Sequence, residues 1–135
     1  MMQLINTAST AVNAGGTLPA NLDFNTNENV LDFNSNTNEI LFKQPGIYKV
    51  TANVVFEATA AGTNTISAYS STNGAAVPGL TSTVETADAT QTATYSLEKD
   101  VRIAPSALGS YARMNLLSNV AGTMLNLVVS VEKLR

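Results

Sequence analysis

Residues 46–58, GIYKVTANVVFEA, alternate between apolar and polar side chains with a period of two. In an extended chain this alternation puts the apolar groups on one face and most of the polar groups on the other. The apolar face would carry Tyr48, Val50, Ala52, Val54, Phe56 and Ala58. The opposite face would carry Lys49, Thr51, Asn53 and Glu57. This stretch is therefore predicted to be a β-strand with one buried face.

Two further stretches, residues 92–103 and 124–134, repeat this alternation. The expected inward residues of the last stretch are Leu125, Leu127, Val129 and Val131. Shorter candidate strands, separated by turn-forming Gly, Pro and Asn, lie at residues 3–12, 38–43, 64–70, 80–86 and 111–118. No segment keeps helical spacing. We therefore predict an all-β fold, a two-sheet antiparallel jelly-roll sandwich of about eight to ten strands.

The composition limits the number of domains and the kinds of chemistry available to the chain. The chain has 135 residues, of which 44% are hydrophobic and 13% are charged, as expected for one compact domain spanning residues 1–135. It contains no Cys, His or Trp. Disulfides, Cys/His zinc sites, thiol nucleophiles and imidazole bases are therefore excluded within the chain. We expect a binding or structural protein without enzymatic activity.

Catalysis by carboxylates is the remaining enzymatic alternative, because glycoside hydrolysis needs only two of them. Glu57, Glu98, Asp100 and Glu132 fall on the polar faces of alternating stretches, where a solvated surface charge is the commoner explanation. We predict no catalytic residue and no cofactor. A platform on which sugars stack needs aromatic side chains, and the tyrosine candidates are Tyr48, Tyr69, Tyr95 and Tyr111. Tyr48 and Tyr95 alternate with core residues, so packing explains those two better.

The charge distribution argues against nucleic acid as a partner. The net charge is −3, and residues 1–42 contain four acidic residues and no Lys or Arg, so no basic patch is available to neutralise phosphates. The first residues, MMQLINTAST, lack the charged and apolar regions of a signal peptide, and no apolar run is long enough to span a membrane. We expect a chain made in the bacterial cytoplasm, with no export signal and no membrane partner.

A short repeat lies near the N-terminus: residues 23–31, DFNTNENVL, are followed by residues 32–40, DFNSNTNEI. Hard oxygen ligands at alternate positions suggest a calcium site, for which the candidates are Asp23, Asn25, Asn27, Asp32, Asn34 and Asn36. The sixth position holds Glu28 or Thr37, where an EF-hand loop needs Gly. We therefore predict no metal site but a polar hairpin with Asx-turns, and keep calcium as the alternative.

Three segments, in the same order and spacing, resemble the C1q/TNF-like jelly-roll family. Residues 45–52, PGIYKVTA, are similar to the family's PGxYxVxxxV strand, and residues 66–79 are similar to a strand that ends in NGxxVPG. Residues 125–134 resemble the last strand of bacterial members, which include phage virion proteins and the heads of spore-surface collagen-like glycoproteins. The resemblance covers residues 38–135 and implies a homotrimer that serves as a binding head.

The sequence offers its own argument for self-association. Some strands carry hydrophobic residues on both faces, as in Val54-Val55-Phe56, Leu116-Leu117 and Leu127-Val128-Val129. One sandwich core cannot bury both faces of a strand, whereas a closed cyclic interface buries the surplus equally in every protomer. The alternative is a monomer in which these doublets mark β-bulges or a fully buried strand.

These observations lead to one leading expectation and two alternatives. The leading one is a homotrimeric, non-enzymatic phage virion protein: a head fibre, a capsid decoration or a fibre tip that attaches to the host. Its partners would be a capsid or other virion protein, contacted through the N-terminal arm, and a host surface glycan, contacted through residues 71–79 and 105–110. Residues 1–20 would form either a docking arm or a first strand. The alternatives are a soluble carbohydrate-binding module and a bacterial spore-surface protein, although the collagen-like stalk of the latter is missing.

Overall fold

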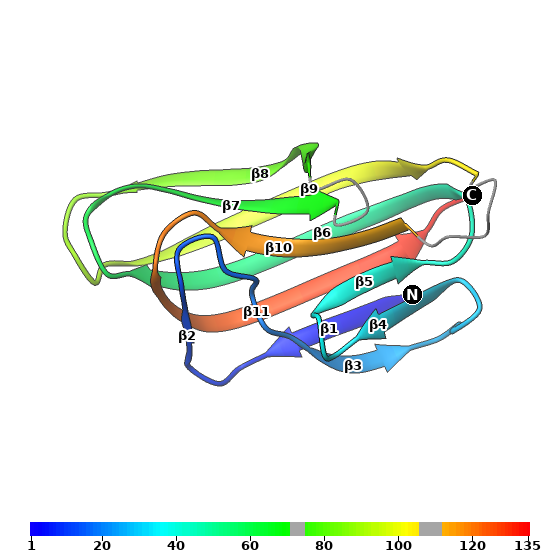
Figure 1. Ribbon diagram of the computed structural model, residues 1–135, viewed down its shortest axis with the longest axis horizontal. Coiled ribbons are helices and arrows are strands. Elements are labelled where there is room, and N and C mark those ends of the chain that lie inside the picture. The colour runs from blue at the N-terminus through cyan, green and yellow to red at the C-terminus, as the bar shows by residue number, and fades with distance from the viewer. Residues whose placement is uncertain (71–74, 106–111) are drawn as a thin grey trace.

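The computed structural model describes residues 1–70, 75–105 and 112–135, which form two antiparallel β-sheets packed face to face (Figure 1). The strand order of the first sheet is β3 (Asn21–Asn25), β1 (Met2–Asn6), β11 (Gly122–Lys133), β6 (Gly46–Ala58) and β9 (Thr92–Ile103), and β2 (Thr10–Val12) also pairs with β11. The strand order of the second sheet is β4 (Leu31–Asn34), β5 (Glu39–Phe42), β10 (Ala112–Ser118), β7 (Gly62–Ser70) and β8 (Ala75–Thr86).

The predicted all-β sandwich is confirmed, with eleven strands in the described residues rather than eight to ten. The expected strand at residues 3–12 is divided into β1 and β2, and the Asn-rich repeat supplies β3 and β4. The second difference has a physical reason. Asn and Asp have low strand propensity, so β3 and β4 are held by pairing to their neighbours rather than by their own preference.

The core lies between the sheets, and the three long strands predicted from alternation stand side by side as β11, β6 and β9. All six residues predicted on the apolar face of β6 are buried, with exposed fractions of 0–3%. Tyr48 packs edge-on against Phe42 with ring centroids 4.9 Å apart, and its hydroxyl donates to the Gln44 carbonyl at 2.6 Å. Tyr95 packs in the same way against Phe56 at 6.4 Å. The packing interpretation of Tyr48 and Tyr95 is thus confirmed.

β11 departs from the predicted register at one position. Its pairing with β6 shifts between Met124 and Asn126, which is a β-bulge. Because the bulge adds one residue, Met124 is fully buried and Leu125 is only half-buried. The prediction that Leu125 points into the core is therefore wrong, whereas Leu127 and Val129 do so as expected.

The N-terminal residues contact both sheets. β1 pairs with β3 on one side and β11 on the other, and the Met1 amino group donates to Thr26 Oγ1 at 2.7 Å. The chain then runs beside β10 in the second sheet, where Gly15 and Leu18 donate backbone hydrogen bonds to Ser118 and Leu116, both at 2.8 Å. These contacts place residues 2–6 as a paired strand within the sandwich.

The two copies of the repeat adopt different structures. The first copy begins in β3 of the first sheet and crosses to the second sheet, whereas the second copy forms the β4–β5 hairpin. The predicted Asx-turns are present: the side-chain oxygens of Asn25, Asn27 and Asn34 accept the backbone N–H two residues on, at 3.0–3.2 Å. The predicted hairpin is thus limited to one copy, because the first copy spans two sheets.

Candidate binding surfaces

The outer face of the first sheet carries a small apolar patch. Val128 pairs with Ile5 of β1 on one side and with Asn53 of β6 on the other, and Val55 lies two residues beyond Asn53. Ile5, Val55 and Val128 are half-buried, while their chain neighbours on the inner face are buried. We call these three residues the apolar patch. The surplus hydrophobic side chains predicted from Val54-Val55-Phe56 and Leu127-Val128-Val129 therefore lie on an outer sheet face.

The third doublet, Leu116-Leu117, has a different explanation. Leu116 is buried in the core, and Leu117 faces outward beside Thr17, with which it forms an isolated β-bridge. Residues 15–18 thus extend the second sheet next to Leu117. This doublet is accommodated within one chain and gives no support for self-association.

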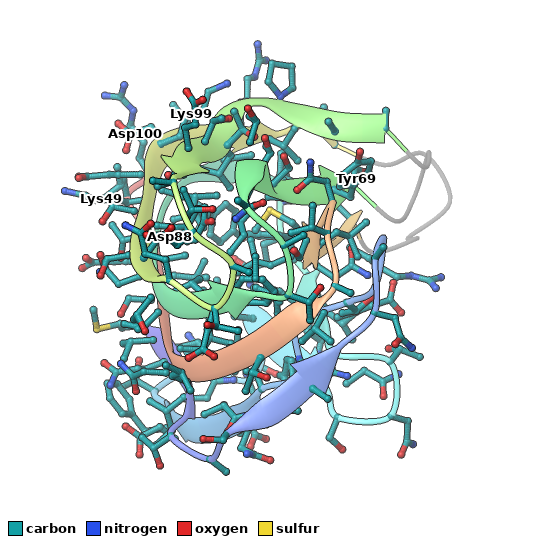
Figure 2. The ribbon with its side chains drawn as sticks, turned by 90° about the vertical axis from the view of Figure 1, so that its left-hand side faces the viewer. Lys49, Tyr69, Asp88, Lys99 and Asp100 are labelled. Atoms are coloured by element: carbon teal, nitrogen blue, oxygen red, sulfur yellow. The ribbon has the colours of Figure 1, made fainter. Side chains whose placement is uncertain are left out.

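Charged residues border the apolar patch at one end of the first sheet. Lys49 Nζ lies 3.1 Å from Glu98 Oε1, and Lys49 is paired in register with Glu132 and Asp100 on the two adjacent strands. The hydrogen bond that Lys49 donates to Glu98, together with the negative charges of Glu98, Asp100 and Glu132, raises the pKa of Lys49. Figure 2 shows Lys49, Lys99 and Asp100 along this side of the molecule, with Tyr69 on the far side. This exposed ion pair stabilises the fold only weakly.

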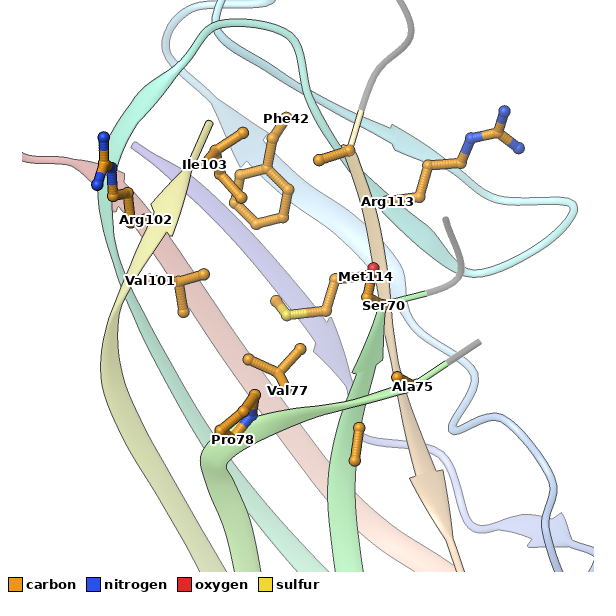
Figure 3. A pocket seen from close by; sticks show the side chains of 12 residues that line it. Phe42, Ser70, Ala75, Val77, Pro78, Val101, Arg102, Ile103, Arg113 and Met114 are labelled. Atoms are coloured by element: carbon orange, nitrogen blue, oxygen red, sulfur yellow. The ribbon is translucent and has the colours of Figure 1, made fainter. Parts of the chain in front are cut away.

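A pocket of about 210 Å³ opens between the sheets at one end of the sandwich (Figure 3). Its wall is mainly apolar and comes from Phe42 on β5, Met114 on β10, Val77 on β8 and Val101 and Ile103 on β9. Residues 75–78, part of the segment 71–79 expected to meet the host, line this pocket. Residues 75–79 belong to β8, but residues 71–74 and 106–110 lie outside the described residues, as does Tyr111.

The six calcium candidates are not gathered at one place: Asp23 and Asn25 lie in β3 of the first sheet, Asp32 and Asn34 in β4 of the second, and Asn27 and Asn36 in connecting segments. Asp23 Oδ2 accepts a hydrogen bond from Gln3 Nε2 at 3.2 Å, and Asp32 Oδ1 accepts the Phe33 N–H at 2.8 Å. Among residues 1–70, 75–105 and 112–135, no group of three or more His, Cys, Asp or Glu is placed to hold a metal ion. Calcium binding by amide and carboxylate oxygens here stays the alternative hypothesis.

The acidic residues weighed for catalysis lie on the outer face of the first sheet. Glu57, Glu98, Asp100 and Glu132 alternate with buried residues of β6, β9 and β11. No helix in the described part of the chain is long and apolar enough to cross a membrane.

One surface was missed by the sequence analysis: a polar patch on the outer face of the second sheet, over β10, β7 and β8. Its own residues are uncharged, although Glu85 of β8 and Arg113 of β10 lie on the same face. Its residues include Thr65, Ser67 and Tyr69 of β7 and Thr81 and Thr83 of β8. Alternating Thr and Ser mark each strand as half-buried. Only the pairing of β7 with β8, which no local pattern encodes, brings them together on one surface.

Comparison with known proteins shows the fold. No family model and no curated protein sequence matches the chain. Among solved structures, Eiger TNF from S. frugiperda matches with a TM-score of 0.75 and 8% identity, over 99% of this chain and 91% of that one. The globular domain of the zebrafish complement 1qA protein gives 0.72 and 9%, over 99% and 96%. The chain has the C1q/TNF-like jelly-roll fold.

This C1q/TNF-like fold also occurs in a phage protein. The PRD1 vertex protein P5 matches with a TM-score of 0.60 and 15% identity, over 99% of this chain and 72% of that one. The family resemblance drawn from residues 38–135 is thus supported at the level of fold, and the match extends to the N-terminal strands. At these identities the comparisons establish architecture alone.

Proposed function

We propose that the chain is a non-enzymatic, homotrimeric structural protein of a phage virion: a head fibre, a capsid decoration or a fibre tip. The apolar patch of Ile5, Val55 and Val128 carries this proposal. In the described residues no other element covers the outer face of the first sheet, so these side chains stay partly in water in a single chain. A closed cyclic assembly removes the same patch from water in every protomer.

The comparisons supply the second support. Domains of the C1q/TNF-like type, whose resemblance implies a trimer, share this architecture, and so does a vertex protein of phage PRD1. A vertex protein is a structural component of a particle. In this proposal the pocket end of the sandwich, with residues 75–79, faces the host, and other virion proteins contact the exposed edges.

The mass of the protein in solution tests the trimer. Light scattering after size exclusion is expected to give about 42 kDa, three copies of the 14.1 kDa chain. Val128→Asp puts a charge in the apolar patch and is expected to reduce the mass to that of one chain. Thr83→Asp, on the outer face of the second sheet, is the matched control and should leave the mass unchanged. A 14.1 kDa wild-type protein would overturn the trimer.

The place of the protein on a particle needs a separate test. Antibodies raised against the purified protein would be used for immunogold labelling of particles and cells from the source of the gene. Gold on phage heads or fibres is the expected result, and its position distinguishes head from tail. Labelling confined to spores or to cells without particles would contradict a virion role.

A further inference from the structure

The polar patch on the second sheet is made of side chains that lie in register on β10, β7 and β8. In β7, Ile66 and Ala68 are buried, so Thr65, Ser67 and Tyr69 point outward. The registers align Leu117, Ser67 and Thr81 across β10, β7 and β8. Thr17 extends this row through its bridge with Leu117. The face therefore presents hydroxyl groups around one aromatic and one aliphatic side chain.

A hollow of about 80 Å³ lies on this face. Thr65, Ser67 and Tyr69 line one side of it, and Gly15 and residues 117–119 line the rest. Asn119 is fixed in place because its Oδ1 accepts the Thr65 N–H at 2.7 Å and its own N–H donates to the Thr65 carbonyl at 3.0 Å. The hollow is thus built on hydrogen-bonded backbone rather than on a free loop.

The hydroxyl groups next to the hollow are paired with one another. Thr65 Oγ1 lies 3.0 Å from Thr83 Oγ1, and Ser67 Oγ lies 2.5 Å from Thr81 Oγ1. The Thr65–Thr83 pair uses one of its two O–H donors and keeps the other for a ligand. In the Ser67–Thr81 pair, Thr81 also donates to the Ile66 carbonyl at 3.3 Å, so this pair offers a ligand only acceptor lone pairs. No residue that lines the hollow is charged, although the protein carries a net charge of −3. The chemistry of this surface matches a ligand that is neutral and rich in hydroxyl groups.

We propose that this hollow binds a neutral saccharide. A pyranose ring has an apolar C–H face and a rim of hydroxyls that both donate and accept hydrogen bonds. Tyr69 and Leu117 would contact the C–H face, and Ser67 and Thr65 would bond the rim. An anionic sugar is disfavoured, because no Lys or Arg lines the hollow to pair with its charge.

The size of the hollow sets the strength of binding. Pockets that enclose a whole small molecule measure about 300–1,000 Å³, so a hollow of about 80 Å³ admits only part of one sugar ring. Each site is therefore weak, with a Kd in the millimolar range. Firm attachment to a glycan surface requires several linked sites, which the proposed trimer provides. Binding at a single site does not depend on the trimer.

Nuclear magnetic resonance titration tests this proposal. Maltotetraose, cellotetraose and tetra-N-acetylchitotetraose are added separately to ¹⁵N-labelled protein, with sialyllactose as the anionic probe. One or more neutral probes should shift the amide signals of Ser67, Tyr69 and Leu117. Tyr69→Ala should weaken that binding about tenfold, as for the loss of one aromatic contact. Ser67→Ala should weaken it less.

Two control variants distinguish the saccharide site from the proposed trimer. Ser96→Ala removes a hydroxyl that donates to Asn53 Oδ1 at 3.0 Å on the first sheet, and it should not change saccharide binding. Val128→Asp should preserve single-site binding even as it removes the trimer, so failure of one proposal is distinguishable from failure of the other. No shift with any neutral probe at about 20 mM, or shifts confined to the first sheet, would overturn the saccharide site. An unchanged affinity in a folded Tyr69→Ala protein would also overturn the saccharide site. If Tyr69→Ala does not fold, an unchanged affinity in Ser67→Ala would overturn it instead.

Discussion

At the scale of single residues, Tyr48 is the test of which face of β6 is buried. It is fully buried, packs edge-on against Phe42 and bonds the Gln44 carbonyl. Tyr48→Ala is therefore expected to lower the free energy of unfolding by about 3–5 kcal/mol. Thr51→Ala, on the outer face of the same strand, should change it by less than about 1 kcal/mol. Urea unfolding measures both values, and equal small effects would show that the inner face is wrongly assigned.

The same residue makes stability depend on alkaline pH. Burial raises the pKa of Tyr48 above its ordinary value of 10.0. Above about pH 10 the unfolded chain loses this proton while the folded chain keeps it, so the folded state loses stability as pH rises. Unfolding at pH 8 to 11 should show this fall. The phenylalanine of Tyr48→Phe has no proton to lose, so the stability of this variant should fall less as the pH rises. If its stability falls as much as that of the wild type, Tyr48 does not cause the pH dependence.

At the scale of elements, alternation in the sequence identified the three long strands and their inner faces but not their neighbours. The reason is physical: a period of two records which side chains are buried, whereas pairing depends on contacts between distant segments. β6 lies between β11 and β9 because of such contacts. For the same reason the sequence predicted a strand at residues 64–70 without showing that Ser67 and Thr81 share one surface. The position of Leu125 outside the core could not be predicted, because it results from a β-bulge in the pairing of β11 with β6. No residue type in the sequence marks that bulge.

Asn25 holds the crossover between β3 and β4, where the chain passes from one sheet to the other. Its Nδ2 donates to the Leu31 carbonyl at 2.7 Å and its Oδ1 accepts the Asn27 N–H. Asn25→Ala removes both bonds and is expected to lower the free energy of unfolding by about 1–3 kcal/mol. Asn36→Ala, in the exposed turn of the β4–β5 hairpin, should cost less. Thermal unfolding with and without calcium checks both; a calcium-dependent stabilisation lost in Asn25→Ala would favour the metal site instead.

At the scale of the whole molecule, the two outer sheet faces differ in what they offer to partners. The first sheet presents the apolar patch bordered by Lys49, Glu98 and Asp100, while the second presents neutral hydroxyl groups around Tyr69. Apolar surface gains most from being removed from water, and hydroxyl groups gain from staying accessible to a polar ligand. Self-association through the first face and ligand binding through the second are therefore compatible in one assembly.

If self-association buries the apolar patch, the stability of the fold depends on the concentration of the protein. Three chains that unfold together release three unfolded molecules, so dilution favours unfolding by mass action. The melting temperature of the wild type should therefore rise over about a hundredfold increase in concentration, whereas that of Val128→Asp should stay constant. Calorimetry of both proteins at several concentrations makes the measurement. A wild-type melting temperature independent of concentration would mean that the patch stays in contact with water, and that the sandwich is stable as a single chain.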